Sequence, residues 1–263
     1  MTERPWGKEN WLLADLGYID SEVRDGWLRG NTLSELMETY LEKMVGDDTF
    51  EYYGLQFPVS VKTMEFEGDT PVFVHPDDVV AEQRYDSLGK IAVWRVVSAE
   101  PDATLLLGFR KSLTAEAFYS AAQAGELASL MNKIPVHAGD TFVLEPGVVY
   151  AFHGKARVIE VSEASSLIFD LTDPEDLVEA FDFISLDAYR SRSEGMTKAG
   201  ACETPHFRLQ PVLGPEDGEA EFVLHLSPDG SRLTFFPAEA DKKTFPKEGL
   251  FIRPGRLSPT EDL

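Results

Sequence analysis

The sequence predicts a mostly β protein, with a β-sandwich or β-barrel core and added helices. Many short apolar segments are separated by turn residues, and only three longer segments have helical spacing. The hydrophobic fraction, 43%, is that of an ordinary globular protein. The 263 residues are enough for one large all-β domain or two modest ones.

In the first half of the chain, one helix precedes a series of strands. Thr32 and Glu35 have the form of a capping box, and apolar residues follow at helical spacing, which predicts a helix over 32–48. Strands are expected where hydrophobicity alternates or a short apolar run ends at turn residues. These segments are 59–64, 72–75, 91–98 and 104–109.

The second half contains two further helices among short strands. One helix is predicted over 112–134 from its apolar positions, and one over 174–192, where Pro174 suits a first turn. The acidic stretch 160–190 is interpreted as a solvated helix face. The expected strands are 140–146, 148–154, 156–162, 166–171, 206–212, 220–226, 231–236 and 249–253.

The charge of the chain excludes several classes of partner. Twenty-four Lys and Arg against 46 Asp and Glu leave a net charge of −22. Such a surface repels phosphate backbones and anionic membranes, so we expect neither as a partner. The single cysteine, Cys202, excludes an internal disulfide framework. No apolar run reaches the ~20 residues of a membrane span, and the N-terminus is charged, so a cytoplasmic protein is expected.

Two segments resemble metal-binding strands of a known superfamily. Gly139-Asp140, five further residues, Pro146-Gly147 and then Tyr150 resemble the second cupin motif, whose last position is usually a metal-binding His. Upstream, PVFVHPDD at 71–78 resembles the first metal-binding strand of the type I mannose-6-phosphate isomerases, a cupin family. In that family the run usually reads Ser-Val-Gln-Val-His-Pro-Asp-Asp, and Pro71 stands in place of its Ser.

Other segments resemble the same family in the same order along the chain. They are SEVRDGWLRGNTLSEL, FPVSVKTME, GKIAVW, MNKIPVHAGDTF, VIEVSEAS and DLVEAFDFIS, so that the resemblance covers roughly residues 4–190. It implies a cupin-type jelly-roll barrel with helical insertions and a shortened second β-lobe. The predicted organisation is a core at 1–191, a linker at 192–205 and the C-terminal β-lobe at 206–263.

The resemblance also implies a zinc site, but this sequence lacks most of the residues that would bind the zinc. The family's ligands are a Gln and a His two residues apart, a Glu in Gly-Lys-x-Glu, and a His after the proline-glycine turn. Phe73, His75, Ala92 and Tyr150 stand at these positions. Zinc in proteins is held by about four N, O or S donors, and one imidazole does not suffice. We therefore predict no cofactor and name no catalytic residue.

The resemblance also implies an Arg that assists catalysis, and this sequence lacks it. The strand that leads to it is about three residues shorter here, and Ser166 or Leu167 falls nearest its place. Two family residues are retained, Lys90 of the Gly-Lys pair and Glu160.

The leading interpretation is a homologue without zinc-dependent isomerase activity that binds a sugar or another small polar ligand. Aromatic rings fill the volume of a metal and its waters and pack against a sugar face. Because the chain has a large net negative charge, we expect a neutral ligand or none. The predicted lining is Phe73, His75, Lys90, Trp94, Tyr150 and Glu160. His75 is also the kind of residue found hydrogen-bonded in a core.

Two alternatives from other classes stay open. The first is an active aldose–ketose isomerase with a relocated zinc site, in which His75 works with nearby carboxylates. The candidate acids are Asp77, Asp78, Glu145 and Glu160, and the other candidate histidines are His137 and His153. Solvated rim acids, a backbone cap at Asp77 and a turn at His137 explain these residues without a metal. The second alternative is a structural or interaction module, as a possible oligomer, with the pocket packed shut.

Overall fold

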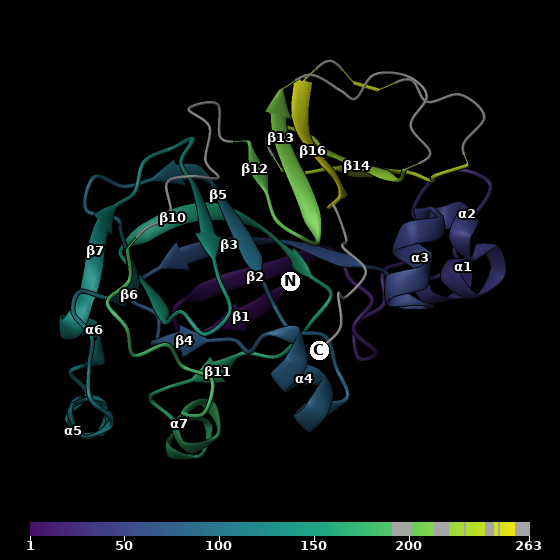
Figure 1. The fold of residues 1–263 in the computed structure, drawn as a ribbon. Helices are drawn as coiled ribbons and strands as arrows, with labels where there is room; N and C mark the ends of the chain where they lie inside the picture. The colour runs from purple at the N-terminus through teal and green to yellow at the C-terminus, as the bar shows by residue number, and fades with distance from the viewer. Residues whose placement is uncertain (191–200, 213–220, 229, 240–244, 247, 256–263) are drawn as a thin grey trace. The chain divides into compact units, whose positions relative to one another are not determined.

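The computed structural model describes residues 1–190, 201–212, 221–228, 230–239, 245–246 and 248–255 (Figure 1). The chain forms two compact units. The first consists of Met1–Asn10 and Thr63–Ser193, and the second of Trp11–Lys62 and Glu194–Leu263. Most of the predicted linker at 192–205 lies outside the described residues. The division predicted from the sequence therefore stays a prediction.

Two β-sheets contain the strands of the first unit. The six-stranded sheet has the order β1 (Thr2–Arg4), β2 (Gly7–Leu13), β3 (Val59–Glu67), β10 (Lys155–Glu163), β5 (Ala92–Ala99) and β8 (Thr141–Leu144). The five-stranded sheet has the order β11 (Phe169–Asp170), β4 (Phe73–Val74), β9 (Tyr150–His153), β6 (Thr104–Phe109) and β7 (Met131–Pro135). Every ladder of the second sheet is antiparallel. The mostly β prediction is confirmed.

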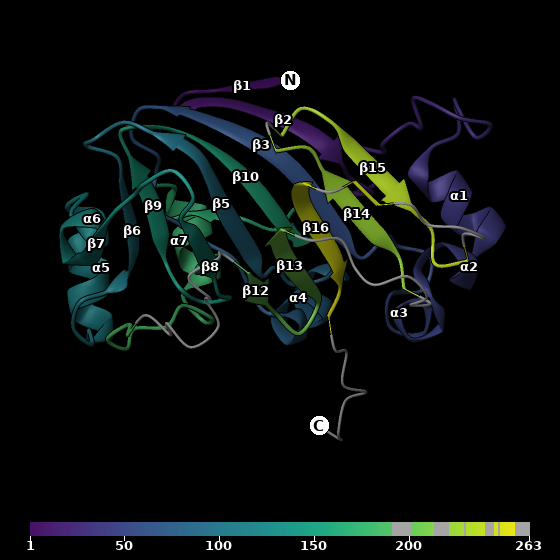
Figure 2. The same cartoon turned by 90° about the horizontal axis from the view of Figure 1, so that it is seen from above.

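Side-chain alternation along the strands gives the first unit two apolar layers. The inner layer lies between the sheets, where Leu105 and Leu107 of β6 meet Trp94 of β5. Leu106, between them in sequence, points to the other face of the five-stranded sheet. There it packs with Phe118 of helix α5 (Ala115–Gln123) and with residues of α6 (Leu127–Leu130) and α7 (Pro174–Ala180). Figure 2 shows α5 and α6 beside β7.

The helix predicted over 112–134 is wrong at its C-terminal end. Residues Met131–Pro135 form strand β7, whose Lys133 pairs with Leu106 of β6. The Asn132 side-chain amide also donates to the carbonyl oxygen of Leu107, at 3.0 Å. Pairing with a distant strand has therefore overridden a local pattern that fits a helix.

Two other predicted helices are shorter than their patterns suggest. The segment 32–48 is broken by Leu41, at φ 52°, and by Gly46, at φ 93°. It forms α1 (Leu33–Tyr40), α2 (Glu42–Val45) and α3 (Asp47–Tyr53), and the capping box at Thr32 is confirmed. Helix α7 ends at Ala180 instead of residue 192, because the chain then turns to place Ala188 beside Phe109 of β6.

Helix α4 (Asp78–Tyr85), which the sequence did not predict, pairs with part of the acidic stretch. The Arg84 guanidinium lies 2.6 Å from the Asp182 carboxylate, and the Tyr85 hydroxyl donates to Glu179 at 2.9 Å. Exposed pairs of this kind contribute little to stability, and the acids from Asp173 onward form a largely solvated surface.

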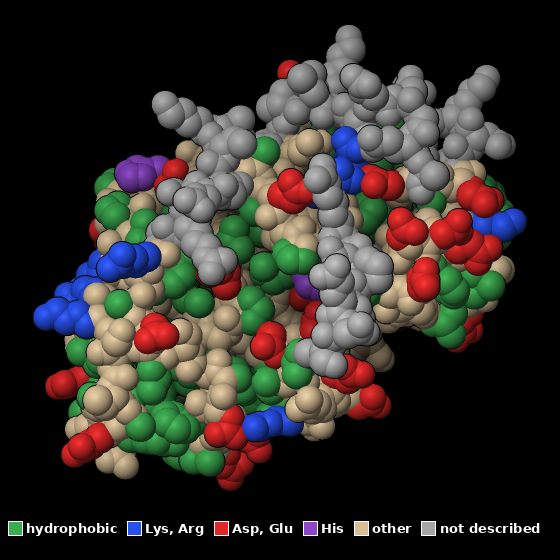
Figure 3. Space-filling view, in the orientation of Figure 1, with side chains coloured by type: hydrophobic (Ala, Val, Ile, Leu, Met, Phe, Trp, Pro, Cys, Tyr) green, Lys and Arg blue, Asp and Glu red, His purple; other side chains and the backbone are tan. Residues whose placement is uncertain are grey.

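The prediction of a solvated helix face is wrong at the start of the stretch, because Glu160 and Glu163 are buried in strand β10. Asp and Glu side chains are scattered over the face shown in Figure 3, in keeping with the net charge of −22.

The second unit contains α1, α2 and α3 and a five-stranded sheet. The sheet order is β12 (Cys202–Glu203), β13 (Phe207–Val212), β16 (Glu248–Pro254), β14 (Val223–Leu226) and β15 (Leu233–Phe236), which confirms the strands expected in the C-terminal lobe. Phe57 packs against Phe222 and Phe235, with ring centroids 5.4 and 5.5 Å apart. None of the helices in the described ranges is long and apolar enough to cross a membrane.

The outer apolar layer of the five-stranded sheet predicts a large effect for Phe118→Ala. Phe118 is fully buried between α5 and the sheet, so its loss should lower the free energy of unfolding by about 3–5 kcal/mol. Val178→Ala, on the exposed face of α7, is the control and should change it by less than about 0.5 kcal/mol. Urea unfolding measures both, and equal effects would contradict this packing.

Candidate functional site

The four positions that correspond to the family's zinc ligands come together inside the first unit. Phe73 of β4 is the register partner of Tyr150 of β9, and their ring centroids lie 5.9 Å apart. His75 follows β4 on the same side, with its ring 5.2 Å from that of Tyr150. Ala92 begins β5 and belongs to the same inner core as Tyr150 and Trp94. The positions assigned by resemblance are therefore neighbours in space.

The residues at these positions do not fit zinc. Phe73 and Ala92 have no donor atom. The Tyr150 phenol is 3% exposed, and burial raises its pKa well above the usual value, so the phenol stays protonated and is a poor ligand. His75 is the single conventional zinc ligand of the four. Among the described residues, no group of three or more His, Cys, Asp or Glu with ligand atoms gathered for a metal includes His75.

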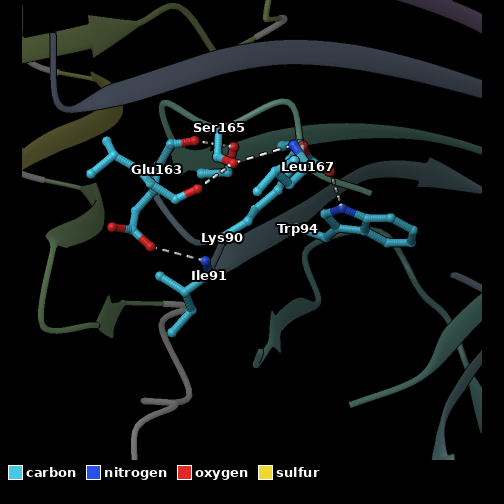
Figure 4. A network of polar contacts seen from close by, with 9 residues as sticks. Lys90, Ile91, Trp94, Glu163, Ser165 and Leu167 are labelled. Carbon is cyan, nitrogen blue, oxygen red and sulfur yellow. Dashed lines mark hydrogen bonds and ion pairs between the residues drawn. The ribbon is translucent and has the colours of Figure 1, made fainter. Parts of the chain in front are cut away.

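A buried ion pair lies beside this aromatic group. Lys90 Nζ is 3.1 Å from Glu160 Oε1, and both side chains are only 4% exposed. Glu160 of β10 is the register partner of Trp94 of β5, whose indole Nε1 donates to Glu160 Oε2 at 2.8 Å. Figure 4 shows Lys90 and Trp94 within this polar network. The two retained family residues thus contact each other directly.

A close backbone approach positions Lys90. A Cβ on Gly89 would lie 2.4 Å from the carbonyl carbon of Asp77, so only glycine fits there. The Gly89 amide donates to Asp78 Oδ1 at 2.8 Å, and the Lys90 amide to the Pro76 carbonyl oxygen at 3.0 Å. The HPDD segment and the Gly-Lys pair therefore form one joined turn that brings Lys90 to β10.

The end of β10 anchors the other side of this turn. Ser165 Oγ donates to the Leu88 carbonyl oxygen at 2.7 Å, and the Leu167 amide donates to Ser165 Oγ. Glu163 accepts from the Ile91 amide at 3.2 Å (Figure 4). The shortened segment around Leu167, where the family has its Arg, thus serves here to hold the loop that carries Lys90.

The other sequence candidates have structural roles. Asp77 caps helix α4 by accepting from the Val80 amide at 2.9 Å, as expected. His137 lies in a turn closed by Asp140, also as expected. Glu145 accepts from the Val148 amide through its backbone. His153 ends β9 opposite Thr104 of β6.

Sequence reasoning missed Glu9 and its partner Arg4. Glu9 is a buried residue of β2, and its Oε2 accepts from Arg4 Nε at 2.7 Å. The negative charges of Glu160 and Glu9 both raise the pKa of Tyr150, after the larger effect of burial. Both carboxylates therefore act on the same phenol. Hydrophobic and polar residues alternate little over residues 2–13, so no strand was predicted there. The family resemblance, which begins near residue 4, was the main indication that this segment belongs to the fold.

Comparison with known proteins agrees with this geometry. No protein-family model matches the chain. The chain is 30% identical over 224 residues to the probable mannose-6-phosphate isomerase GmuF of Bacillus subtilis, covering 84% of this chain and 67% of that protein. This chain belongs to the mannose-6-phosphate isomerase family. It is also 28% identical over 190 residues to mannose-6-phosphate isomerase ManA of the same organism, of which it spans 58%.

Solved structures of mannose-6-phosphate isomerases show the same fold. The B. subtilis enzyme has a TM-score of 0.73 at 20% identity, covering 94% of this chain and 89% of that one. A mannose 6-phosphate isomerase crystallised with zinc and yttrium has a TM-score of 0.62 at 12% identity, covering 95% and 86%. The cupin-type fold predicted from the sequence is confirmed. The absence of zinc binding in this member of the family stays a prediction.

The close approach at Gly89 predicts a specific effect of Gly89→Ala. The added methyl group would push the turn at Asp77 away from Lys90, and we expect a loss of about 1–3 kcal/mol in the free energy of unfolding. Gly68→Ala is a matched control, because a Cβ there meets nothing within 4 Å. Thermal and urea unfolding should separate the two variants. Identical midpoints would show that the turn is not closed as described.

The raised pKa of Tyr150 predicts alkaline sensitivity. In the unfolded chain a tyrosine titrates near pH 10, whereas the folded state keeps Tyr150 protonated to higher pH. Stability should thus be intact below about pH 10 and fall above it, by up to about 1.4 kcal/mol per pH unit for this group. Tyr150→Phe should flatten the slope measured by urea unfolding from pH 9 to 11.5. The exposed control Tyr18→Phe should keep it, and an unchanged slope in Tyr150→Phe would refute the assignment.

Proposed function

We propose that this chain is a member of the mannose-6-phosphate isomerase family that lacks zinc-dependent isomerase activity and binds a sugar in the interior of its barrel. One observation carries the proposal. At the converged ligand positions, three residues cannot hold zinc, yet the adjoining Lys90–Glu160–Trp94 network is kept.

The missing activity follows from charge. Exchanging an aldose for a ketose requires a base and a positive centre for the enediolate charge, and in this family zinc supplies that centre. Here a neutral phenol, Tyr150, stands at one ligand position, and the negative charges of Glu160 and Glu9 act on it. These charges would oppose a developing negative charge at that position.

The sugar-binding role follows from what the interior retains. A buried ion pair is often less stabilising than apolar side chains of the same volume, so stability alone does not favour keeping Lys90 with Glu160. Ionisable groups that are buried beside a specific charge partner cluster at functional sites. Trp94, Phe73 and Tyr150 add aromatic faces, which pack against the apolar faces of sugars.

A second candidate is a structural module with a closed interior. The observation that favours it is burial: His75 is fully buried, and Tyr150 lies over its ring. A closed module predicts that no sugar binds and that none changes the thermal stability of the protein. An active isomerase with a relocated metal site has weaker support, because the described donors do not gather around His75.

An assay of the intact chain with zinc added tests the loss of activity. Conversion of mannose 6-phosphate to fructose 6-phosphate should be no faster than with the His75→Ala variant, which removes the one retained ligand position. Turnover that needs zinc and disappears in His75→Ala would refute the proposal and establish the relocated-site enzyme.

Binding is tested separately by thermal unfolding with a panel of hexoses and hexose phosphates. At least one should raise the melting temperature in a saturable manner, since a ligand that binds only the folded state stabilises it. Trp94→Phe, which removes the indole donor to Glu160, should weaken that effect. No shift with any member of the panel would favour the closed module.

A further inference from the structure

We propose that an exposed loop around Trp27 docks on the acidic face of helix α7 in a second copy of this chain. The Trp27 loop comprises residues 22–32, and the α7 face consists of Glu175, Val178 and Glu179. None of these residues belongs to the inner core of the barrel, so the inference does not depend on the proposed sugar-binding function. It is carried by the exposure of Trp27, the charges beside it and the matching character of the α7 face.

Trp27 is a large apolar side chain that the fold leaves in water. It is 82% exposed, and among the described large apolar residues only Met1 is more exposed. The ring of Tyr40 supports it edge to face, with the centroids 6.2 Å apart. Tryptophan is enriched among the residues that dominate the binding energy of protein interfaces. Trp27 therefore has the character of an interface anchor.

Internal hydrogen bonds hold the Trp27 loop in one conformation. The Val23 amide donates to the Asn31 carbonyl oxygen at 3.0 Å, and the Gly30 amide donates to the Val23 carbonyl oxygen at 3.0 Å. The Asn31 side-chain amide donates to the Leu28 carbonyl oxygen at 2.7 Å. A loop that is already ordered loses little conformational entropy on binding, which favours association.

The charged side chains of the loop leave two arginines for a partner. Arg24 and Arg29 are exposed, and neither forms an ion pair within the part of the chain that the structure describes. Asp25 is engaged by Arg232 at 3.3 Å. Glu22, the other acid of the loop, lies at its base in an isolated β-bridge. The tip of the loop is therefore an aromatic ring with available guanidinium groups beside it.

The α7 face has the complementary character. Glu175, Val178 and Glu179 have the spacing of neighbours on one side of a helix, and all three are exposed. Val178 is 66% exposed, so the face has an apolar centre between two carboxylates. Figure 1 shows α7 at the periphery of the first unit. An indole can cover the valine while arginines pair with the carboxylates, often through two parallel hydrogen bonds.

The net charge of −22 on each copy does not prevent this contact. At physiological ionic strength the Debye length is about 8 Å, so acids far from the contact are screened, whereas charges in contact still interact. Arginine brought to a carboxylate is attractive at that range. A second copy therefore suits the loop, because its surface supplies both the carboxylates and the exposed apolar centre.

Sedimentation velocity of the intact chain measures the association. The sedimentation coefficient should rise from the monomer value between ~1 and ~300 µM protein, the range of weak complexes. Trp27→Ala should weaken the association at least about tenfold, as truncation of an interface anchor does. Leu55→Ala removes another exposed apolar side chain and is the control, which should associate as the wild type does. Raising the NaCl concentration from ~0.1 to ~0.5 M should also weaken the association, because screening reduces the attraction between arginine and carboxylate.

Mixing two variants tests whether the loop meets α7. Val178→Arg places a positive charge at the centre of the α7 face and should by itself abolish association as Trp27→Ala does. An equimolar mixture of the two variants should associate again, because the intact α7 face of one meets the intact loop of the other. Val79→Arg, at an exposed valine of α4, is the matched control and should associate as the wild type does.

The results that would overturn the inference are distinct from those that bear on sugar binding. A wild-type chain that stays monomeric over the whole range contradicts it, as does a dimer that Trp27→Ala leaves unchanged. A mixture that stays monomeric would show that the loop does not dock on α7. The thermal shift produced by a sugar should be the same in Trp27→Ala as in the wild type, so the two proposals fail separately.

Discussion

The buried ion pair between Lys90 and Glu160 is the interaction on which the interior of the first unit depends. Both charges lie away from water, so removing either one would leave the other uncompensated, at a large cost in stability. Keeping the pair requires β5 and β10 in register, which places Trp94 opposite Glu160. It also requires the tight turn at Gly89, where no other residue fits. Lys90 and Glu160, which the family resemblance places beside the zinc-ligand positions, thus constrain the packing of the first unit.

The replaced ligands change the electrostatics as well as the coordination. In a zinc site, the dication would offset nearby carboxylates. Here Phe73 and Ala92 are neutral, and Tyr150 is held protonated by burial and by the charges of Glu160 and Glu9. The chain's own cations offset these acids one for one, through Lys90 and Arg4. Without a bound metal, this region would therefore lack both a Lewis acid and the positive charge that suits phosphorylated ligands.

Sequence reasoning was most successful where alternation and motifs coincide. Val74 and Phe73 point to opposite sides of β4, and the spacing of PVFVHPDD and of the Pro146-Gly147 turn brought Phe73, His75 and Tyr150 together as expected. It failed where long-range pairing decides. Met131–Pro135 follows a helical pattern but joins β6. Glu9 lies in a short polar hairpin, β1–β2, whose place in the sheet is set by the distant strand β3. The turn at Gly89 is defined by a backbone approach that no local pattern encodes.

Zinc stoichiometry measured by native mass spectrometry tests the central claim most directly, that the family's metal site is gone. The wild-type chain and His75→Ala should take up the same amount of zinc, because His75 alone does not form a site. A variant that restores the donors, with Phe73→Gln, Ala92→Glu and Tyr150→His, should gain about one zinc per chain in a manner that requires His75. A wild-type chain that binds one zinc and loses it in His75→Ala would contradict the account.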